Sequence, residues 1–563
     1  MQGFGEKRLP YKKKNKNKNA ETIMAKMLNQ AFKFHSEGNI SDAVGSYEYC
    51  LSRGVNDYRF FTNYGLLLRD LGKFEKAENL LRKAIEIRPD ISSTYLNLAA
   101  ILRNLRKLEE AENFLRKAIE IKPDFAMAYS NLGNVLRDLG KLEEAENFLR
   151  KAIEIDSKLA IAYLNLGNTL KDLSKLVEAE NFLRKAIEIK PDFAIAYLNL
   201  GNTLKDLGKL EEAEKILRKA ITLNPNLARA YYSLSTLKIS TEDFLFYKYL
   251  FSKDILNKKN DEEKIDIFFA RANLLHIQKK YLESSKLLQK ANNLKLKLNP
   301  FYPEDLIKKS NNLLIESNKQ IIDTDQVGNN YENIFITGMP RSGTTLVESI
   351  ISTNKNVLDL GETNILEESF LESKKASGEK SLAEVYTNKI KCLNSKLTIT
   401  TNKWLYNYVY AGIIANQLPN SKIIYCFRNP LDNILSIYRA NFKSGNQYAS
   451  SLKDCANVYL HHEEIINVYT KQYPLKIYKL NYDKLVTNPD EQIKLLVNWL
   501  GWKWENAYLN PHKNRRSVTT ASNVQIRSPI NSKSIGGWRN YKNILQPALE
   551  ILIKTEKYQD LID

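Results

Sequence analysis

The sequence has little cysteine and lacks a long apolar run. Its four cysteines among 563 residues are widely spaced and include no C-x-x-C pair, which argues against a disulfide scaffold and a zinc site and fits a reducing compartment. It has no stretch of eighteen apolar residues, so no membrane span is predicted. The first twenty residues are basic and are not followed by an apolar core, so no secretory signal is predicted. These absences predict a soluble, cytoplasmic protein.

Acidic residues are fewer than basic ones. Asp and Glu number 65 against 84 Lys and Arg, which leaves a net charge of +19 and favours anionic partners or ligands. Residues 1–23 form a basic tail whose Lys- and Asn-rich composition predicts a disordered, solvated arm. Nucleic acid, suggested by the charge alone, is therefore not the expected partner. The length predicts two or three domains.

A repeat of 34 residues runs through the first part of the chain. One small position recurs as Ala43, Ala77, Ala111, Ala145, Ala179 and Ala213. Prolines keep the same register at Pro89, Pro123, Pro191 and Pro225. Each copy predicts two amphipathic helices, such as 127–139 and 141–154, with proline blocking continuation of the second helix. This pattern resembles the tetratricopeptide repeat, whose stacked units form an all-α solenoid.

The chain is predicted to be multidomain. The solenoid is expected over 24–298, with a degenerate last part at 228–298, and 299–330 is expected to be a linker because it holds prolines and little periodicity. Over 331–563, short apolar strands alternate with helical patterns, the strands lying at 334–337, 397–400, 422–427 and 475–480. This alternation predicts an α/β domain with a parallel sheet.

Two columns of asparagine follow the first helix of successive repeats. They are Asn97, Asn131, Asn165 and Asn199 and, one turn on, Asn134, Asn168 and Asn202. In the resembled repeat the first helix lines the concave face, and an amide can both donate to and accept from an extended peptide backbone. We interpret the columns as a surface that binds a peptide or protein. The alternative is that they are solvated remnants of recent duplication.

A loop typical of anion binding follows the first predicted strand, in I-F-I-T-G-M-P-R-S-G-T-T-L at 334–346. Backbone N–H groups and hydroxyls converge where such a loop enters a helix, and the helix dipole favours an anion. The loop departs from the ATP-binding pattern G-x-x-x-x-G-K-[ST], because Thr344 follows Gly343 where the lysine belongs. No magnesium-holding acid follows an obvious second strand. ATP hydrolysis is therefore disfavoured and no metal is expected.

The segment G-M-P-R-S-G-T-T-L resembles the phosphosulfate loop of sulfotransferases, and in particular that of the protein-tyrosine sulfotransferase branch. Further segments follow in the order of that family, namely L-G-E-T at 360–363, N-K at 402–403, the stretch 418–438, Y-D-K-L-V-T-N-P at 482–489, A-S-N-V-Q-I from 521 and S-P-I…G-W at 528–538. Together they cover nearly all of 331–540. Repeats ahead of such a domain resemble a bacterial family of tetratricopeptide-repeat sulfotransferases, with an α/β, P-loop-like second domain.

The resemblance implies transfer of a sulfuryl group from 3′-phosphoadenosine 5′-phosphosulfate (PAPS), with 3′,5′-adenosine bisphosphate (PAP) as product. The implied cofactor site consists of Pro340, Arg341, Ser342, Gly343, Thr344, Thr345, Arg428 and Ser436. The implied catalytic residues are Glu362, Lys403, Arg341 and Ser522. Residues 342–345 would cradle the 5′-phosphosulfate, and Arg428 with Ser436 would hold the 3′-phosphate. Glu362 would accept the proton of the acceptor hydroxyl, while Lys403 and Ser522 offset charge on the leaving oxygen.

The acceptor and one departure from the family pattern leave alternatives open. The branch resemblance and the asparagine columns favour a tyrosine of a peptide or protein, and a glycan or small hydroxylated molecule is the alternative. Gly537 precedes Trp538 where the branch carries a basic residue, which leaves that cofactor contact without its usual side chain. The competing hypothesis is a non-catalytic scaffold whose repeats bind a partner and whose degenerate second domain senses a nucleotide.

Overall fold

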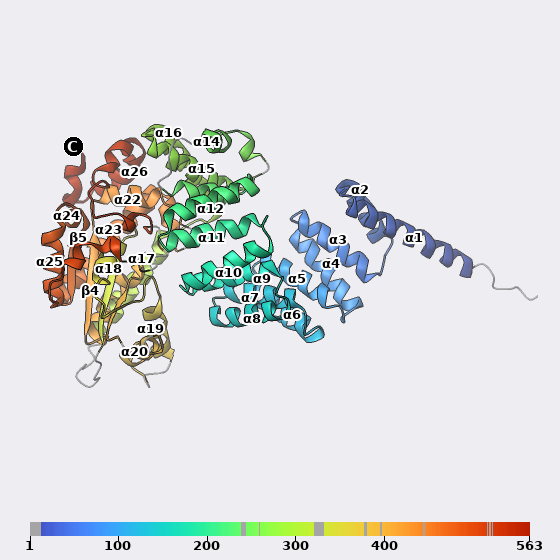
Figure 1. The fold of residues 1–563 in the computed structure, drawn as a ribbon, viewed down its shortest axis with the longest axis horizontal. Coiled ribbons are helices and arrows are strands. Elements are labelled where there is room, and N and C mark those ends of the chain that lie inside the picture. The colour runs from blue at the N-terminus through green and yellow to red at the C-terminus, as the bar shows by residue number, and fades with distance from the viewer. Residues whose placement is uncertain are drawn as a thin grey trace, which may run out of the picture. The chain divides into compact units, whose positions relative to one another are not determined.

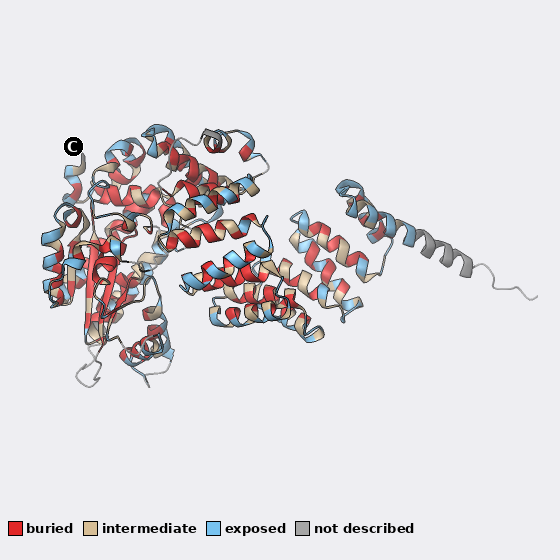
Figure 2. Cartoon of the chain, viewed as in Figure 1, coloured by how far each residue is buried: buried red, intermediate tan, exposed pale blue. Residues whose placement is uncertain are grey.

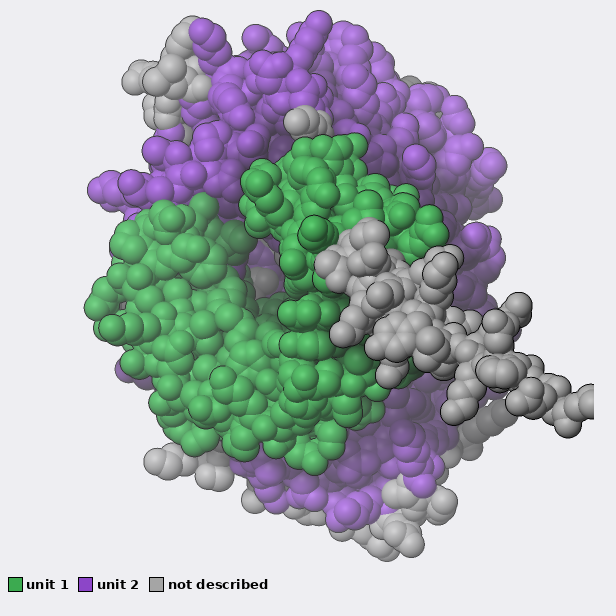
Figure 3. Space-filling view, turned by 90° about the vertical axis from the view of Figure 1, so that its right-hand side faces the viewer, with its two compact units in different colours: residues 1–196 green, residues 197–563 purple. Residues whose placement is uncertain are grey.

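The structure is a computed structural model of the 563-residue chain. It describes residues 13–237, 244–257, 259–319, 331–375, 380–393, 397–442, 445–514, 516, 520 and 522–562. The chain divides into two compact units, residues 1–196 and 197–563 (Figure 3). The division falls inside the predicted solenoid, so its last repeats belong to the same unit as the sheet.

Unit 1 is built of successive helices that pack in pairs (Figure 1). They are α1 (Lys13–Ser36), α2 (Ile40–Ser52), α3 (Tyr58–Asp70), α4 (Phe74–Ile87), α5 (Ser92–Asn104), α6 (Leu108–Ile121), α7 (Ala126–Asp138), α8 (Leu142–Ile155), α9 (Ala160–Asp172) and α10 (Leu176–Ile189). The pair α7 and α8 lies within one residue of the predicted helices 127–139 and 141–154. The predicted all-α solenoid is therefore confirmed.

Small residues lie buried between the helices of each repeat, whereas charged residues form ion pairs on the second helices. Ala111 and Ala145 are fully buried in the core, as the close approach of helices requires. On the second helices the charges pair within and between repeats, because Arg116 donates to Glu112 (2.7 Å) and to Glu144 (2.5 Å). Pairs at i,i+4 on a helix, such as Arg116 with Glu112, contribute only about 0.2–0.5 kcal/mol each. Burial of the apolar residues, and not these pairs, is the main source of the solenoid's stability.

Unit 2 begins with the remaining repeats. Its first helices are α11 (Ala194–Asp206, which crosses the division), α12 (Leu210–Leu223), α13 (Ala228–Ser235), α14 (Phe244–Leu250), α15 (Asp261–Ile277) and α16 (Tyr281–Leu298). The hydroxyl of Ser284 on α16 donates to the carbonyl oxygen of Ala272 on α15 at 2.8 Å. The segment that the sequence marks as degenerate thus still contains a packed helix pair.

Two predicted boundaries differ from the structure. The predicted linker 299–330 contains helix α17 (Pro303–Lys319), whose proline occupies the first helical position, where its missing N–H removes no helical hydrogen bond. The helix buries Leu313 in a core cluster of the sheet domain, so 303–319 is part of that domain. The predicted disordered tail lies outside the described residues over 1–12, and helix α1 occupies its remainder. The disorder of the Lys- and Asn-rich tail stays a prediction.

The pair α15–α16 is fixed to the sheet domain by hydrogen bonds from side chains to main-chain carbonyls. Asn292, 1% exposed, donates to the carbonyl oxygen of Tyr438 at 3.0 Å. Lys295 donates to the carbonyl oxygen of Phe442 at 2.6 Å. The same helices share an apolar core with residues such as Leu431. Because buried polar groups are costly without partners, these contacts define one position for the helix pair.

The sheet has five parallel strands in the described part of the chain, in the order β2-β3-β1-β4-β5. They are β1 (Glu332–Gly338), β2 (Val357–Asp359), β3 (Ile399–Asn402), β4 (Ser421–Phe427) and β5 (Ile477–Asn481). The central strands are almost wholly buried (Figure 2). Ile334 and Phe335 contribute to different core clusters, so the sheet is covered on both faces. The predicted α/β domain is confirmed.

Helices alternate with these strands along the chain. They are α18 (Thr344–Ile351), α19 (Ile365–Lys375), α20 (Leu382–Leu393), α21 (Ala411–Gln417), α22 (Pro430–Tyr438), α23 (Leu452–Gln472), α24 (Tyr482–Thr487), α25 (Pro489–Leu500) and α26 (Lys542–Leu552). The four predicted strands overlap β1, β3, β4 and β5. Strand β2 was not predicted, because three residues are too few to carry a recognisable alternation.

Candidate functional site

The candidate residues lie at the carboxyl ends of the strands. The loop after β1, residues 338–345, is called the cradle loop below. Glu362 follows β2, Lys403 follows β3 and Arg428 follows β4. The carboxyl ends of parallel strands lie at one edge of a sheet. Strands β2 and β3 lie on one side of β1, and β4 and β5 lie on the other. Parallel sheets bind ligands at the point where the strand order reverses in this way. The fold therefore brings residues that are far apart in the sequence to one edge.

The cradle loop turns sharply into α18. Gly343 has a φ of +97°, and a Cβ on it would lie 2.2 Å from the ring of Tyr482, so this position requires glycine. Asn433 on α22 donates to the carbonyl oxygen of Pro340 at 2.9 Å and holds the first half of the loop. Thr344, 4% exposed, begins α18. The loop is thus held from two neighbouring strand ends.

The hydroxyls of the cradle loop are buried beside the helix N-terminus. Ser342 is 1% exposed, and its Oγ has no hydrogen-bond partner among the described residues. Thr345 is 5% exposed, and its Oγ1 lies 3.3 Å from Oγ1 of Thr520. A buried hydroxyl without a partner costs free energy, whereas an anion at the positive end of the helix dipole would accept from it. The loop is therefore suited to an anionic group.

Arg341 joins the cradle loop to the C-terminal segment, residues 522–538. Its Nε donates to Ser436 Oγ at 3.1 Å, its Nη1 to Ser522 Oγ at 2.5 Å and its Nη2 to Gln525 Oε1 at 2.8 Å. Burial, followed by the nearby guanidinium of Arg428, lowers the pKa of Arg341 to about 10. Neighbouring positive charges of this kind favour an added anion. The structure brings three of the sequence-derived candidates together and adds Gln525, which the sequence did not single out.

Lys403 lies between two carboxylates. It is 1% exposed, and its Nζ donates to Glu362 Oε1 at 2.6 Å and lies 3.8 Å from Glu348 Oε2. The backbone N–H of Lys403 donates to the carbonyl oxygen of Gly361 at 2.9 Å, which brings the turn after β2 beside β3. The side chain of Glu362 is 35% exposed. Glu362, the candidate base, is thus accessible to solvent, whereas the Lys403 ammonium group that donates to it is buried.

Glu348 completes this ion network from helix α18. It is 1% exposed, and its Oε2 accepts from Arg516 Nη2 at 2.8 Å, while Arg516 also pairs with Asp359 at the end of β2. Glu348 was not among the residues predicted from the sequence, because a single acid in T-T-L-V-E-S-I-I at 344–351 is expected on a helix surface. Its position one turn after an anion-binding loop, among apolar residues, was the available signal.

Arg428 is buried on the other side of the cradle loop. It is 5% exposed, its Nη2 donates to the carbonyl oxygen of Ser534 at 2.8 Å, and its guanidinium lies 4.8 Å from the ring centre of Tyr482. The carboxylates of Asp432 and Asp483 are at ion-pair distances of 3.8 and 3.7 Å. Within the described residues its Nε has no hydrogen-bond partner. This buried donor is positioned for an anion that would complete its hydrogen bonds.

Asp432 holds the C-terminal segment against α22. It accepts from the backbone N–H groups of Gly536 (2.7 Å) and Trp538 (3.0 Å). Burial raises the pKa of Asp432, and these two donors and Arg428 oppose the increase. Among the described atoms, a Cβ on Gly537 would have one neighbour within 4 Å, Asp432 Oδ1 at 3.8 Å, so the backbone there has room for a side chain.

The asparagine columns lie on the first helices of the repeats, α5, α7, α9 and α11, and all seven residues are half-buried or buried. Asn165 is 5% exposed and donates to Ser130 Oγ at 3.1 Å, so part of its hydrogen-bonding capacity is used inside the solenoid. The Oδ1 atom of Asn134 is buried without a partner among the described side chains and backbone. Peptide binding by the columns stays a prediction.

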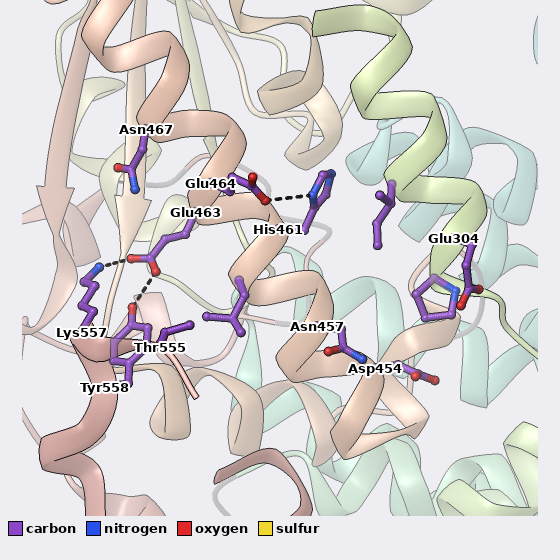
Figure 4. Close-up of a pocket in the computed structure, with 13 residues that line it drawn as sticks. Glu304, Asp454, Asn457, His461, Glu463, Glu464, Asn467, Thr555, Lys557 and Tyr558 are labelled. Carbon is purple, nitrogen blue, oxygen red and sulfur yellow. Dashed lines mark hydrogen bonds and ion pairs between the residues drawn. The ribbon is translucent and has the colours of Figure 1, made fainter. Parts of the chain in front are cut away.

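A separate hollow of about 760 Å³ lies beside α23, between Pro303 at the start of α17 and residues 555–558 (Figure 4). Glu463 accepts from Tyr558 at 2.8 Å and pairs with Lys557, and His461 faces Glu464 at 3.8 Å. Its lining is formed by residues other than the candidates named above. The hollow is therefore distinct from the edge that carries the cradle loop.

The described residues contain no group of three or more His, Cys, Asp or Glu side chains that could hold a metal ion. Among the described helices, none combines the length and the apolar character needed to cross a membrane. The cytoplasmic location stays a prediction.

Comparisons with known proteins match both parts of the chain. Residues 333–506 match the model of the sulfotransferase family, and residues 59–124, 90–158, 124–192 and 194–227 match tetratricopeptide-repeat models. An uncharacterized protein of Aquifex aeolicus (strain VF5) is 33% identical over 261 residues, which are 41% of this chain and 34% of that protein.

Two further relatives are more distant. A putative protein-tyrosine sulfotransferase of Caenorhabditis briggsae is 23% identical over 239 residues, or 37% of this chain and 81% of that protein. The protein-tyrosine sulfotransferase of Drosophila melanogaster is 23% identical over 231 residues, or 36% of this chain and 46% of that protein. The chain thus spans about a third of the first relative and less than half of the last. It carries tetratricopeptide repeats followed by a domain of the sulfotransferase family.

Proposed function

We propose that the chain is a sulfotransferase that moves a sulfuryl group from PAPS to an acceptor hydroxyl. The observation that carries this proposal is a pair of buried donors, Ser342 Oγ and Arg428 Nε, which lie at adjacent strand ends and have no hydrogen-bond partners among the described residues. PAPS has one anionic group at each end of its ribose. Two separate buried donors in a sulfotransferase-family domain suit such a ligand.

The two sides of the cradle loop would hold the two anionic groups. Ser342, Gly343, Thr344 and Thr345 would surround the 5′-phosphosulfate, at the N-terminus of α18. Arg428 and Ser436 would hold the 3′-phosphate, and Arg341 already donates to Ser436. PAPS, when bound, supplies the sulfuryl group and a phosphate oxygen as the leaving group.

The other candidates would act on the protons and charges of the transfer. As the sulfur–oxygen bond to the phosphate breaks and one to the acceptor oxygen forms, Glu362 would take the proton of the acceptor hydroxyl. Lys403 and Ser522 would donate to the leaving oxygen. Lys403 is restrained by Glu362 and Glu348, and Ser522 is tied to Arg341. Groups fixed in this way contribute to catalysis because they need little reorganisation.

We propose a tyrosine of a peptide or protein as the acceptor, recruited by the repeats. Both named sulfotransferase relatives carry protein-tyrosine activity in their names, and the asparagine columns offer amides to an extended backbone. Asn165 has fewer hydrogen-bonding groups available for a peptide, because its Nδ2 already donates to Ser130 Oγ. A glycan or small hydroxylated molecule is the competing acceptor.

Thermal unfolding with PAP, compared with ATP and magnesium, tests the donor. A ligand at a hundred times its dissociation constant adds about 2.7 kcal/mol to the native state. We expect stabilisation by PAP and little by ATP. Stabilisation by ATP alone would contradict the proposed donor, and stabilisation by neither ligand would favour the non-catalytic scaffold.

Transfer from radiolabelled PAPS to a tyrosine peptide, with the wild type and Glu362→Gln, tests the chemistry. Loss of a general base reduces turnover by roughly 10²- to 10⁴-fold, and we expect PAP stabilisation to persist. The matched control is Glu368→Gln, an exposed glutamate on α19, which should retain turnover. Equal turnover in all three proteins would exclude Glu362 as the base.

A further inference from the structure

The last regular repeat is hydrogen-bonded to the segment that carries Ser522. Asp206, at the end of α11, is 6% exposed, and its Oδ1 accepts from Asn523 Nδ2 at 2.5 Å. Asn523 is itself 6% exposed. The two residues are 317 positions apart and both belong to unit 2. A buried contact between a carboxylate and an amide has a well-defined geometry, because either group would be costly to bury alone.

Arg527 forms the second part of this contact. Its guanidinium donates to the carbonyl oxygens of Asn514 (2.9 Å), Arg516 (2.7 Å) and Asp206 (3.4 Å). The side chain crosses the turn after α11 at Gly208, where a Cβ would lie 2.7 Å from Arg527 Nε. The turn and the arginine therefore fit each other closely.

The same turn in other repeats does not require glycine. The positions that correspond to Gly208 at the 34-residue spacing are Gly38, Gly72, Arg106, Gly140 and Ser174. Arg106 and Ser174 both adopt a φ of +61° there, and a Cβ on Gly140 would have no neighbour within 4 Å among the described atoms. The left-handed backbone favours glycine in every copy, and Arg106 and Ser174 show that the turn still accepts a side chain. At 208 a side chain would in addition meet Arg527.

Ser522 and Gln525 belong to the same short segment, 522–528. The backbone N–H groups of Gln525 and Ile526 donate to the carbonyl oxygen of Ser522 (3.0 and 3.2 Å), which makes the segment a compact turn. The side chains of Ser522 and Gln525 accept from Arg341. Fixing Asn523 and Arg527 on the repeat therefore fixes Ser522 and, through it, the guanidinium at the cradle loop.

We propose that Asp206, Gly208, Asn523 and Arg527 are positioning residues for Ser522 and Arg341, so that the last regular repeat is a structural part of the active centre. This inference rests on the proposed function. It also assigns two roles to α11, because Asn199 and Asn202 of the asparagine columns lie on the helix that ends at Asp206. An acceptor held by this repeat would therefore be bound by α11, the same helix that positions Ser522, which would donate to the leaving oxygen.

The first test disrupts the hydrogen bond between Asp206 and Asn523 and then restores it with donor and acceptor exchanged. Asn523→Asp places two carboxylates together, and the double variant Asp206→Asn with Asn523→Asp restores one donor and one acceptor. We expect kcat for transfer from PAPS to fall at least about 10-fold in Asn523→Asp, since small misplacements of reacting groups have effects of this size. The fall in kcat should exceed any rise in KM for PAPS, and the double variant should recover most of the loss.

The second test uses the turn. Gly208→Ser introduces the residue that Ser174 provides in an earlier repeat, and Gly140→Ser is the matched control. We expect lower kcat in Gly208→Ser only. A kcat in Gly208→Ser equal to that of the control, or an Asn523→Asp loss that the double variant leaves unrepaired, would overturn the inference.

Hydrogen exchange of the amides in 522–528, measured on the full chain, separates this inference from the proposed function. Faster exchange in Asn523→Asp and Gly208→Ser, reversed in the double variant, supports anchoring by the repeat even if the wild type transfers no sulfuryl group. In that case only the proposed function fails. Unchanged exchange in both single variants would overturn the anchoring whatever the turnover.

Discussion

The two sides of the cradle loop satisfy their buried charges differently. At the ends of β2 and β3, Lys403 is enclosed by Glu362 and Glu348, and Glu348 accepts from Arg516. One oxygen, Glu348 Oε1, has no hydrogen-bond partner among the described residues. This side is largely closed, because each cation has an acid within hydrogen-bonding distance.

At the ends of β4 and β5, the charges are arranged more loosely. Arg428 faces Asp432 and Asp483 at 3.8 and 3.7 Å, distances too long for hydrogen bonds. Its Nε and the Oδ1 of Asp483 have no hydrogen-bond partners in the described part of the chain. These two atoms face each other at 3.7 Å, so an anion that bound Arg428 Nε would replace a loose ion pair with Asp483. The comparison suggests that the closed side positions groups for chemistry, whereas this looser, open side supplies ligand affinity.

The largest effect on ligand affinity is expected from Arg428→Lys. Lysine keeps the charge and loses the planar fork that binds an anion through two nitrogens. Charge-assisted hydrogen bonds contribute about 1.5–3 kcal/mol, so PAP should bind roughly 10- to 100-fold more weakly in calorimetric titration. Arg116→Lys, in a repeat of unit 1, is the control and should bind PAP as the wild type does. Unchanged affinity in Arg428→Lys would show that the open side is not the phosphate site.

The parts of this arrangement that follow from local patterns could be predicted from the sequence. The repeat was predicted because its small residues and prolines recur every 34 positions, and the cradle loop because strand, glycine turn and helix are consecutive. The residues at the strand ends were found through short motifs such as N-K at 402–403. In each case the information lies within a few residues.

Contacts between distant segments could not be predicted in this way. Glu348 and Arg516 are 168 residues apart, and Asp206 and Asn523 are 317 apart. Each is a common surface residue type until folding buries it against its partner. The attachment of α15 and α16 to the sheet domain could not be predicted for the same reason, because both helices keep a weak repeat pattern while their polar side chains bind that domain.

On the closed side, Glu348→Gln should affect stability more than ligand binding. The variant removes a buried negative charge that accepts from Arg516 and faces Lys403, and we expect a loss of roughly 1–2 kcal/mol in the free energy of unfolding. All five tryptophans lie between residues 404 and 538, so their fluorescence during urea unfolding reports on the sheet domain. PAP affinity should stay within about twofold of the wild type, a shift of no more than roughly 0.4 kcal/mol.

Glu368→Gln provides the control for this variant, because an exposed glutamine substitution is expected to change stability by less than about 0.5 kcal/mol. If Glu348→Gln weakened PAP as much as Arg428→Lys and left stability unchanged, the distinction between a closed and an open side would be wrong.

The smallest effect is expected from adding a charge to the open side. Gly537 precedes Trp538, lies next to Asp432 and has room for a side chain, and its φ is not in the left-handed region. In Gly537→Arg the new guanidinium would lie near Arg428 and Asp432, where it could approach the same anion as Arg428. Partly exposed ion pairs contribute about 0.2–1 kcal/mol, so PAP should bind up to about fivefold more tightly. Gly45→Arg, at an exposed position of α2 whose φ is also outside the left-handed region, controls for the added charge. An equal change in PAP affinity in both variants would mean that the gain comes from net charge. Position 537 would then not contribute to the proposed phosphate site at Arg428.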